Sequence, residues 1–102
     1  MQDDSDKIGT DNEIIKSLVD GDRKTFEALF HKYYSLLCDY ALTYLEDANA
    51  AEDIVQDVFV YLWNHCKSIA ITTSLKSYLY SSVKHRALNV LKHRAIVRKH
   101  SP

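Results

Sequence analysis

The chain has 102 residues, and 46% of them are hydrophobic, which is enough for the core of one small domain and excludes a wholly disordered protein. It has only two glycines, and its one proline is the last residue. Such a shortage of turn-forming residues excludes an all-β protein. We therefore predict an all-α fold, a compact bundle of three to four helices.

The net charge of −1 conceals an uneven distribution along the chain. Residues 1–66 hold all 14 acidic residues and 5 basic ones, which gives a net charge of −9. Residues 67–102 hold the other 8 basic residues and no acidic residue, which gives +8. Because a solvated surface normally mixes the two signs, this segregation predicts two different partners, and the basic third is the candidate for phosphate contact.

Several classes of function are not indicated. The chain has no Gly-rich phosphate loop, no zinc-protease motif and no nucleophile motif, so we predict no enzymatic activity, no metal and no cofactor. Cys38 and Cys66 stand alone beside apolar residues, which predicts buried free thiols. No apolar run approaches a membrane span and no signal-peptide core follows Met1, so we expect a cytoplasmic protein without membrane insertion.

The first part of the chain is predicted to hold a tail and two helices. Residues 1–10 are polar and acidic and are expected to form a disordered tail. Asp11 or Asn12 is predicted to cap a short helix, which Gly21 ends. Asp22 is predicted to cap a longer helix that runs to about residue 45. The inward face predicted for that helix is Phe26, Leu29, Phe30, Tyr33, Leu37, Tyr40, Ala41 and Tyr44.

Residues 49–65 carry the clearest helical pattern, preceded by a short turn in which Asp47 or Asn49 is the expected cap. Their apolar residues gather on one side of a helix: Ala51, Ile54, Val55, Val58, Phe59, Leu62 and, just beyond, Cys66. The opposite side carries Asp53, Gln56 and Asp57 as one cluster, with Val60 beside them. A solvated helix face is the alternative interpretation of this cluster, since carboxylates are favoured near a helix N-terminus.

Residues 66–73 mix β-branched and small residues and are predicted to form a loop that Ile69 and Ile71 anchor. Ser74 is predicted to cap a last helix that continues through at least Leu91. The inward residues predicted for it are Leu75, Tyr78, Leu79, Ser82, Val83, Ala87 and Val90. Its outward residues are Ser77, Ser81, Lys84, His85, Leu88 and Lys92. For Arg86 we predict a structural role, with its guanidinium paired to an acidic residue of another helix, and direct contact with DNA is the alternative.

Four stretches on three predicted helices together resemble region 2 of a bacterial RNA polymerase sigma factor, specifically of the extracytoplasmic-function (ECF) group. The run AEDIVQDVF at residues 51–59, followed by Leu62 and Trp63, carries most of the resemblance. The run FEALF at residues 26–30, followed by Tyr33 and Tyr34, is similar to the first helix of region 2. The runs SLKSYLY at residues 74–80 and RALN at residues 86–89 are similar to the last helix. The resemblance covers roughly residues 22–98.

The resemblance implies a domain for transcription initiation with two partners. The acidic side of the helix at residues 49–65 would dock on the clamp coiled coil of the polymerase β′ subunit. The polymerase-binding candidates are Asp53, Gln56, Asp57 and Val60. The following loop and the last helix would engage the promoter −10 element, with the non-template strand held single and one base flipped into a pocket. The DNA-binding candidates are Lys67, Lys76, Tyr80, Lys84, His85, Asn89 and Lys92.

Two departures from the family pattern matter. Many relatives have Asn where this chain has His85 and Asp where it has Asn89, so the usual −10 base preference does not carry over. An ECF factor also has a region 4, which reads the −35 element, and no part of this chain resembles it. We therefore expect a region 2 domain at residues 11–92 and a basic linker toward a missing region 4 at residues 93–102.

The resemblance also implies an anti-sigma factor as a partner, and we expect the isolated domain to be a monomer. The alternative function is a stand-alone helical DNA-binding transcriptional regulator that uses the basic last helix. It predicts tight duplex binding and no role for Asp53 or Asp57. The chain has no Gly-containing short turn between two compact helices, which a helix-turn-helix regulator would have.

Overall fold

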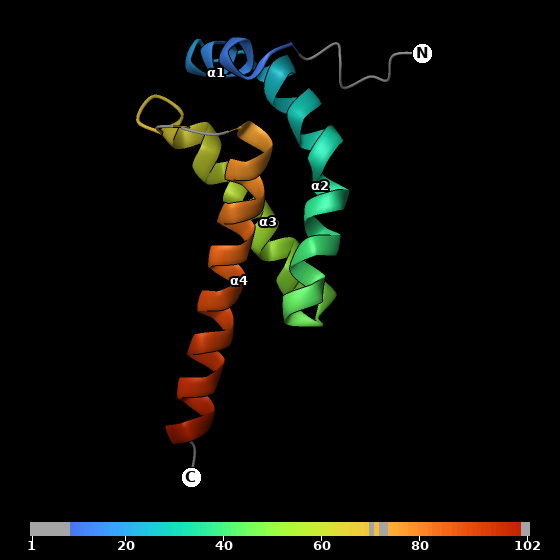
Figure 1. The fold of residues 1–102 in the computed structure, drawn as a ribbon, viewed down its shortest axis with the longest axis vertical. Helices are drawn as coiled ribbons and strands as arrows, with labels where there is room; N and C mark the ends of the chain where they lie inside the picture. The colour runs from blue at the N-terminus through green and yellow to red at the C-terminus, as the bar shows by residue number, and fades with distance from the viewer. Residues whose placement is uncertain (1–8, 70, 72–73, 101–102) are drawn as a thin grey trace.

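The computed structural model describes residues 9–69, 71 and 74–100. This part of the chain forms four helices, which confirms the predicted all-α fold (Figure 1). In chain order they are α1 (Asp11–Val19), α2 (Arg23–Leu45), α3 (Ala48–His65) and α4 (Leu75–His100). The predicted acidic tail lies outside the described residues, apart from Gly9 and Thr10.

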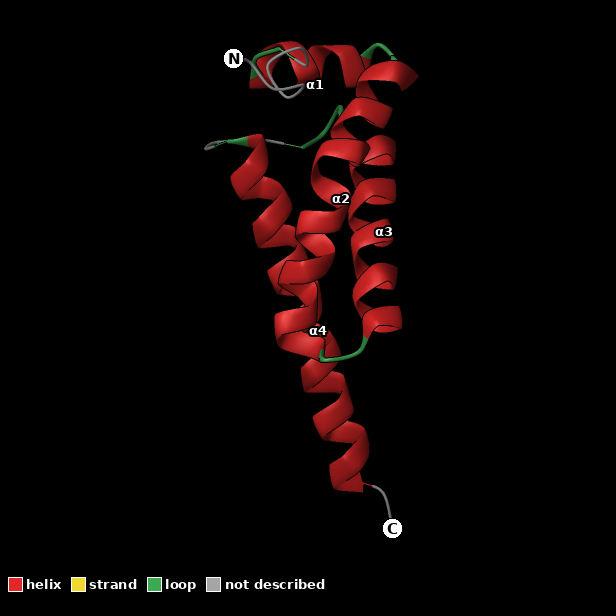
Figure 2. Cartoon of the chain, turned by 90° about the vertical axis from the view of Figure 1, so that its right-hand side faces the viewer, coloured by secondary structure: helices red, strands yellow, loops and turns green. Residues whose placement is uncertain are grey.

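Helices α2, α3 and α4 pack against one another, and α1 lies across the end of the bundle where α2 begins (Figures 1 and 2). The last turns of α4 extend past the other helices and project from the bundle (Figure 2). Among the described residues, no helix is both long enough and apolar enough to cross a membrane.

Side-chain caps explain where three of the helices begin. Asp22 accepts hydrogen bonds from the backbone N–H groups of residues 24 and 25, and Asp47 accepts from those of residues 49 and 50, so these caps are as predicted. Ser74 Oγ accepts from the N–H of Ser77 at 3.0 Å, which confirms the third cap. Gly21 has a φ of 81°, the left-handed conformation expected after the end of α1.

The predicted cap of α1 was wrong. Thr10 caps this helix and forms a capping box with Glu13, whereas Asn12 lies within the helix. The Asp11 carboxylate instead accepts a hydrogen bond from the backbone N–H of Leu75 at 2.9 Å. Asp11 thus satisfies a free donor at the start of α4, a helix that begins 64 residues later.

The core forms where the three long helices meet. Every apolar residue predicted for the inner side of α3 is buried, from Ala51 to Cys66. The predicted side of α2 divides into a buried centre and a half-buried border that includes Phe26 and Phe30. The Phe30 ring lies 4.9 Å from the ring of Phe59 between their centroids. Outside α2 and α3, the buried side chains come from α1, which contributes Ile14 and Leu18, and from α4, which contributes Leu75, Leu79, Val83 and Ala87. The core thereby fixes how α3 and α4 are rotated about their axes.

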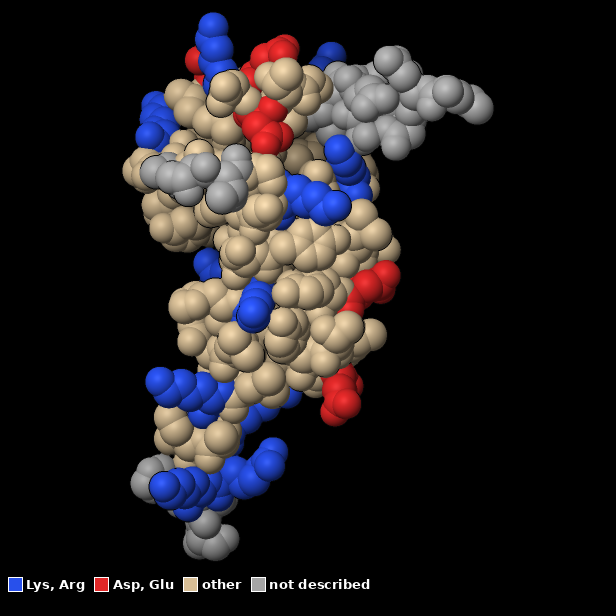
Figure 3. Space-filling view, viewed as in Figure 1, with Lys and Arg blue, Asp and Glu red and all other residues tan. Residues whose placement is uncertain are grey.

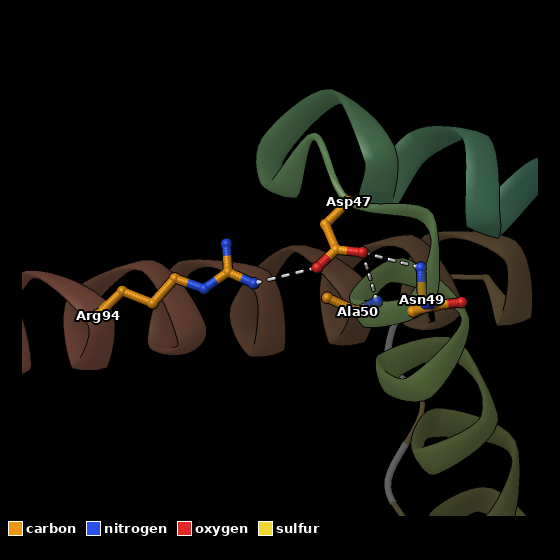
Figure 4. A network of polar contacts seen from close by, with 4 residues as sticks. All are labelled: Asp47, Asn49, Ala50 and Arg94. Carbon is orange, nitrogen blue, oxygen red and sulfur yellow. Dashed lines mark hydrogen bonds and ion pairs between the residues drawn. The ribbon is translucent and has the colours of Figure 1, made fainter.

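Both cysteines are free thiols, although Cys38 is only half-buried while Cys66 is buried as expected. Ile69 and Ile71 pack against the core and anchor the described part of the loop after α3. Helix α4 continues to His100, through residues that we expected to form a linker. Near its projecting end, Arg94 Nη2 lies 3.9 Å from Asp47 Oδ2, which joins α4 to the turn between α2 and α3 (Figure 4).

Candidate binding faces

The first candidate site is the outer side of α3, which we call the acid–amide face and which consists of Asp53, Gln56, Asp57 and Val60. All four side chains are exposed, because the buried stripe of α3 occupies the opposite side of the helix. Val60 is 57% exposed although it is apolar. The Gln56 amide donates a hydrogen bond of 3.4 Å to the hydroxyl of Tyr34 on α2. The face is therefore supported by two helices and combines negative charge with an exposed apolar side chain.

Two hollows lie between α2 and α3 beside the acid–amide face. One, of about 310 Å³, is lined by Arg23, Phe26, Glu27, Val60 and Trp63. The other, of about 320 Å³, is lined by Tyr34, Ser35, Cys38, Asp39, Leu42, Ala48, Ala51 and Glu52. Both linings combine apolar side chains with carboxylates, which are Glu27 in the first and Asp39 and Glu52 in the second, and the first also includes Arg23. Such linings suit a partner helix that carries both apolar and charged side chains.

The seven predicted DNA contacts do not form one cluster. His85 and Asn89 line a common hollow between α3 and α4. Tyr80 lies on the other side of α4, where its ring packs edge to face against Tyr40 at 5.0 Å. The four lysines are exposed. Lys67 lies in the turn directly after α3, and Lys76, Lys84 and Lys92 lie along α4. The structure thus brings together two of the seven residues, and the other five do not line the same hollow.

The hollow that contains His85 and Asn89 has a volume of about 340 Å³. We call it the α3–α4 hollow. Its lining consists of Val58, Tyr61, Tyr78, Ser82, His85, Arg86 and Asn89. The Tyr61 ring stacks on the His65 ring, with centroids 4.0 Å apart and planes 18° apart. The Arg86 guanidinium lies 5.8 Å from the centroid of the Tyr61 ring.

The ion pair predicted between Arg86 and an acidic residue of another helix was wrong. Among the described residues Arg86 forms no ion pair, and its guanidinium lies near the Tyr61 ring. The carboxylates of Asp53 and Asp57 are on the outer side of α3, whereas Arg86 approaches the flank that carries Tyr61. A half-buried guanidinium next to an aromatic ring keeps its N–H donors free for an added acceptor.

The hydroxyl of Tyr78 is neutral at physiological pH. Burial raises its pKa above the ordinary value of 10.0, and this outweighs the opposing effects of a hydrogen bond with Ser82 and of the nearby Arg86 charge. A neutral phenol both donates and accepts hydrogen bonds, as do the amide of Asn89 and the hydroxyl of Ser82. The α3–α4 hollow therefore offers aromatic faces together with polar edges, the combination that holds a planar heteroaromatic ring.

Sequence reasoning missed five residues that line this hollow: Val58, Tyr61, Tyr78, Ser82 and Arg86. Tyr61 lies on the flank of α3, between the buried stripe and the acid–amide face, and was assigned to neither. Its 43% exposure is unusual for an aromatic side chain so close to a core. The spacing of Tyr61 and His65 by four residues is a pattern that could have indicated a ring stack on that flank.

A protein-family model described as Sigma-70 region 2 matches residues 29–96, which is about two thirds of the chain. The matched range contains the acid–amide face, the α3–α4 hollow and all seven predicted DNA contacts. Searches of curated proteins and of solved structures gave no match.

Proposed function

Because the chain belongs to the Sigma-70 region 2 family, we propose that it is the region 2 domain of a sigma factor of the ECF group. The family is not enzymatic and acts in transcription initiation, where it binds core RNA polymerase and promoter DNA. Assignment to the ECF group is supported by the run at residues 51–59 and by the similar stretches in α2 and α4.

The acid–amide face is proposed to bind the clamp coiled coil of the polymerase β′ subunit. Support comes from the exposure of Asp53, Gln56 and Asp57, none of which contributes to the core. The exposed Val60 and the adjoining hollows supply apolar area, which a charged face alone lacks. An anti-sigma factor is proposed to cover the same face and so to compete with the polymerase.

The α3–α4 hollow is proposed to hold one base of the non-template strand of the −10 element. Its volume of about 340 Å³ is at the lower end of the range for small-ligand sites, about 300–1,000 Å³. Tyr61 and Tyr78 supply aromatic faces for stacking, and His85 and Asn89 supply hydrogen-bonding groups for a base edge. The exposed lysines of α4 and Lys67 would follow the phosphates on either side.

The observation that carries the DNA part of this proposal is the meeting of His85 and Asn89 with two tyrosines in one hollow. A base held in this way makes one nucleotide of a bound strand far more important than its neighbours, because stacking on an aromatic side chain contributes about 1–3 kcal/mol per base. The function can therefore be tested by removing bases one at a time.

The experiment uses a short single strand, selected from a randomised pool by the complex of this chain with core polymerase. Each nucleotide is replaced in turn by an abasic site, and binding to the chain is measured. One position should lose about tenfold in affinity, and that loss should nearly disappear in a His85→Ala, Asn89→Ala variant. Ser81→Ala, which alters an exposed residue of α4 outside the hollow, should keep the full loss. A uniform loss at all positions would contradict the base pocket.

A further inference from the structure

Two of the seven Lys and Arg side chains of α4 are half-buried, Arg86 and Arg94, and the other five are exposed. Figure 3 shows Lys and Arg gathered toward the projecting end of this helix. The Arg94 guanidinium lies 3.9 Å from the carboxylate of Asp47 (Figure 4). Arg86 has no such partner among the described residues, and residues 75–100 contain no acidic residue that could supply one from the same helix. Because a half-buried arginine can also serve only to pack its stem, the groups around Arg86 decide whether it has a further role.

The Arg86 guanidinium lines the α3–α4 hollow beside an aromatic ring. It lies 5.8 Å from the centroid of the Tyr61 ring, which stacks on the His65 ring with centroids 4.0 Å apart. A guanidinium is a planar fork of N–H donors and has no acceptor. The hollow therefore places a planar group of donors next to an aromatic face.

The other polar groups of the hollow on α4 lie on the same side of the helix as Arg86. At about 100° per residue, four side chains fall within an arc of about 100°: Ser82, His85, Arg86 and Asn89. The hydroxyls of Tyr78 and Ser82 hydrogen-bond to each other. The Asn89 amide can both donate and accept a hydrogen bond. A ring added to the hollow would thus meet donors at Arg86 and an acceptor at Asn89.

We infer that the α3–α4 hollow selects guanine, with Arg86 donating to its O6 and N7 and the Asn89 amide oxygen accepting from its N1–H or its N2 amino group. This inference rests on the base pocket proposed above and adds which base the pocket takes. Guanine carries O6 and N7 as neighbouring acceptors, which a guanidinium contacts through two N–H groups at once. Adenine has an amino group in place of O6, and that group would face the donors of Arg86. Cytosine and thymine offer only one ring for stacking on Tyr61.

Contact with a phosphate is the other role that Arg86 could have. A phosphate drawn into the hollow would lose hydration, which disfavours it there. Lys84 and Lys92 are exposed and offer contacts on the same helix without that loss. A base edge is therefore the better match for the half-buried donors of Arg86.

The test uses the selected single strand and the position that the abasic-site scan identifies, where we expect guanine. Guanine at that position is replaced by adenine or by 7-deazaguanine, in which a C–H group replaces N7. Each replacement should lower the affinity for the wild-type chain about fivefold or more, the lower end of the discrimination that a bidentate contact gives. Arg86→Lys keeps the charge and loses the planar fork, so each replacement should cost this variant less than about twofold.

The matched control is Arg94→Lys, the same change in the other half-buried arginine of α4, which should keep the wild-type losses. Circular dichroism checks helix content, and the base replacements test the wild-type chain whether or not Arg86→Lys folds. A base other than guanine at the sensitive position, or a 7-deazaguanine loss that Arg86→Lys shares in full, overturns the inference. So does an unchanged base preference in Arg86→Gln with a salt slope lowered by about 0.7, which would indicate a phosphate contact. The proposed function fails separately, if no single position is sensitive to removal of its base.

Discussion

Helices α3 and α4 lie next to each other and share one core, yet their solvent-exposed sides carry opposite charge. Residues 48–65 contain Glu52, Asp53 and Asp57 and no Lys or Arg, whereas residues 75–100 contain seven Lys or Arg and no acidic residue. Both helices bury a regular apolar stripe. The comparison teaches that the buried stripes determine the fold, which leaves the exposed sides free to specify two different partners.

The two helices also form a hollow between them whose lining differs from the exposed side of either helix. Where α3 and α4 adjoin, Tyr61 and Tyr78 line a hollow with His85 and Asn89. At the other end of α3, Asp47 and Arg94 form an ion pair between the acidic and the basic parts of the chain. Changes to the shared core, to the Asp47–Arg94 ion pair and to each exposed side should therefore have separable effects.

The largest effect is expected in the shared core. Leu62 is fully buried on α3, so Leu62→Ala should lower the free energy of unfolding by about 2–5 kcal/mol. Val60→Ala, on the exposed side of the same helix, should change it by less than about 0.5 kcal/mol. Denaturant unfolding of both variants measures the difference. Equal losses would mean that the two sides of α3 are not distinct in the way described.

A smaller effect on the free energy of unfolding is expected at Asp47, which caps α3 and faces Arg94. Asp47→Ala removes a helix cap and should lower the free energy of unfolding by about 1 kcal/mol. Asp47→Asn keeps an oxygen for the cap but loses the charge that faces Arg94, so its loss should be below about 0.5 kcal/mol, as for an exposed ion pair. Thermal unfolding separates the two variants. If Asn proved as costly as Ala, the ion pair would be the main contribution and not the cap.

The smallest effects are expected for single charges on α4. Lys84→Ala and Lys92→Ala should each weaken binding of the selected single strand and lower its salt slope by about 0.7, the contribution of one phosphate on a single strand. Lys24→Ala on α2 serves as the control and should leave the slope unchanged. Fluorescence anisotropy over a range of salt concentrations gives the slopes. Unchanged slopes for Lys84→Ala and Lys92→Ala would show that DNA contacts a different side of the molecule.

Much of the fold could be predicted because helix caps and apolar stripes depend on residues that are close together in the sequence. The caps Asp22, Asp47 and Ser74 act on N–H groups two or three residues away, and the apolar stripe of α3 follows the helical period. Asp11 could not be assigned in this way, since its carboxylate bonds to Leu75 across 64 residues. Periodicity gives no information on such long-range partners.

The candidate site was predicted only in part, for the same reason. The exposed positions of Asp53, Gln56 and Asp57 follow from the period of one helix, and the structure has them exposed. The α3–α4 hollow depends on how two helices cross, which single-helix periodicity does not determine. Arg86 illustrates this, because its neighbour is the ring of Tyr61 and not a carboxylate. Helix α4 is longer than predicted, and it continues to His100 because residues 93–100 contain no Gly or Pro to end it.

The measurement that tests the central claim most directly is binding of wild-type chain and Asp57→Arg to core RNA polymerase and, separately, to the selected single strand. We expect the reversal to reduce polymerase affinity at least tenfold, because opposed like charges cost several kcal/mol at an interface, and to leave strand binding unchanged. Asp20→Arg makes the same charge change at the end of α1 and should affect neither. If Asp57→Arg and Asp20→Arg bound polymerase equally well, the acid–amide face would not be the docking site. If the wild type did not bind polymerase at all, the account would be contradicted in favour of a stand-alone DNA-binding regulator.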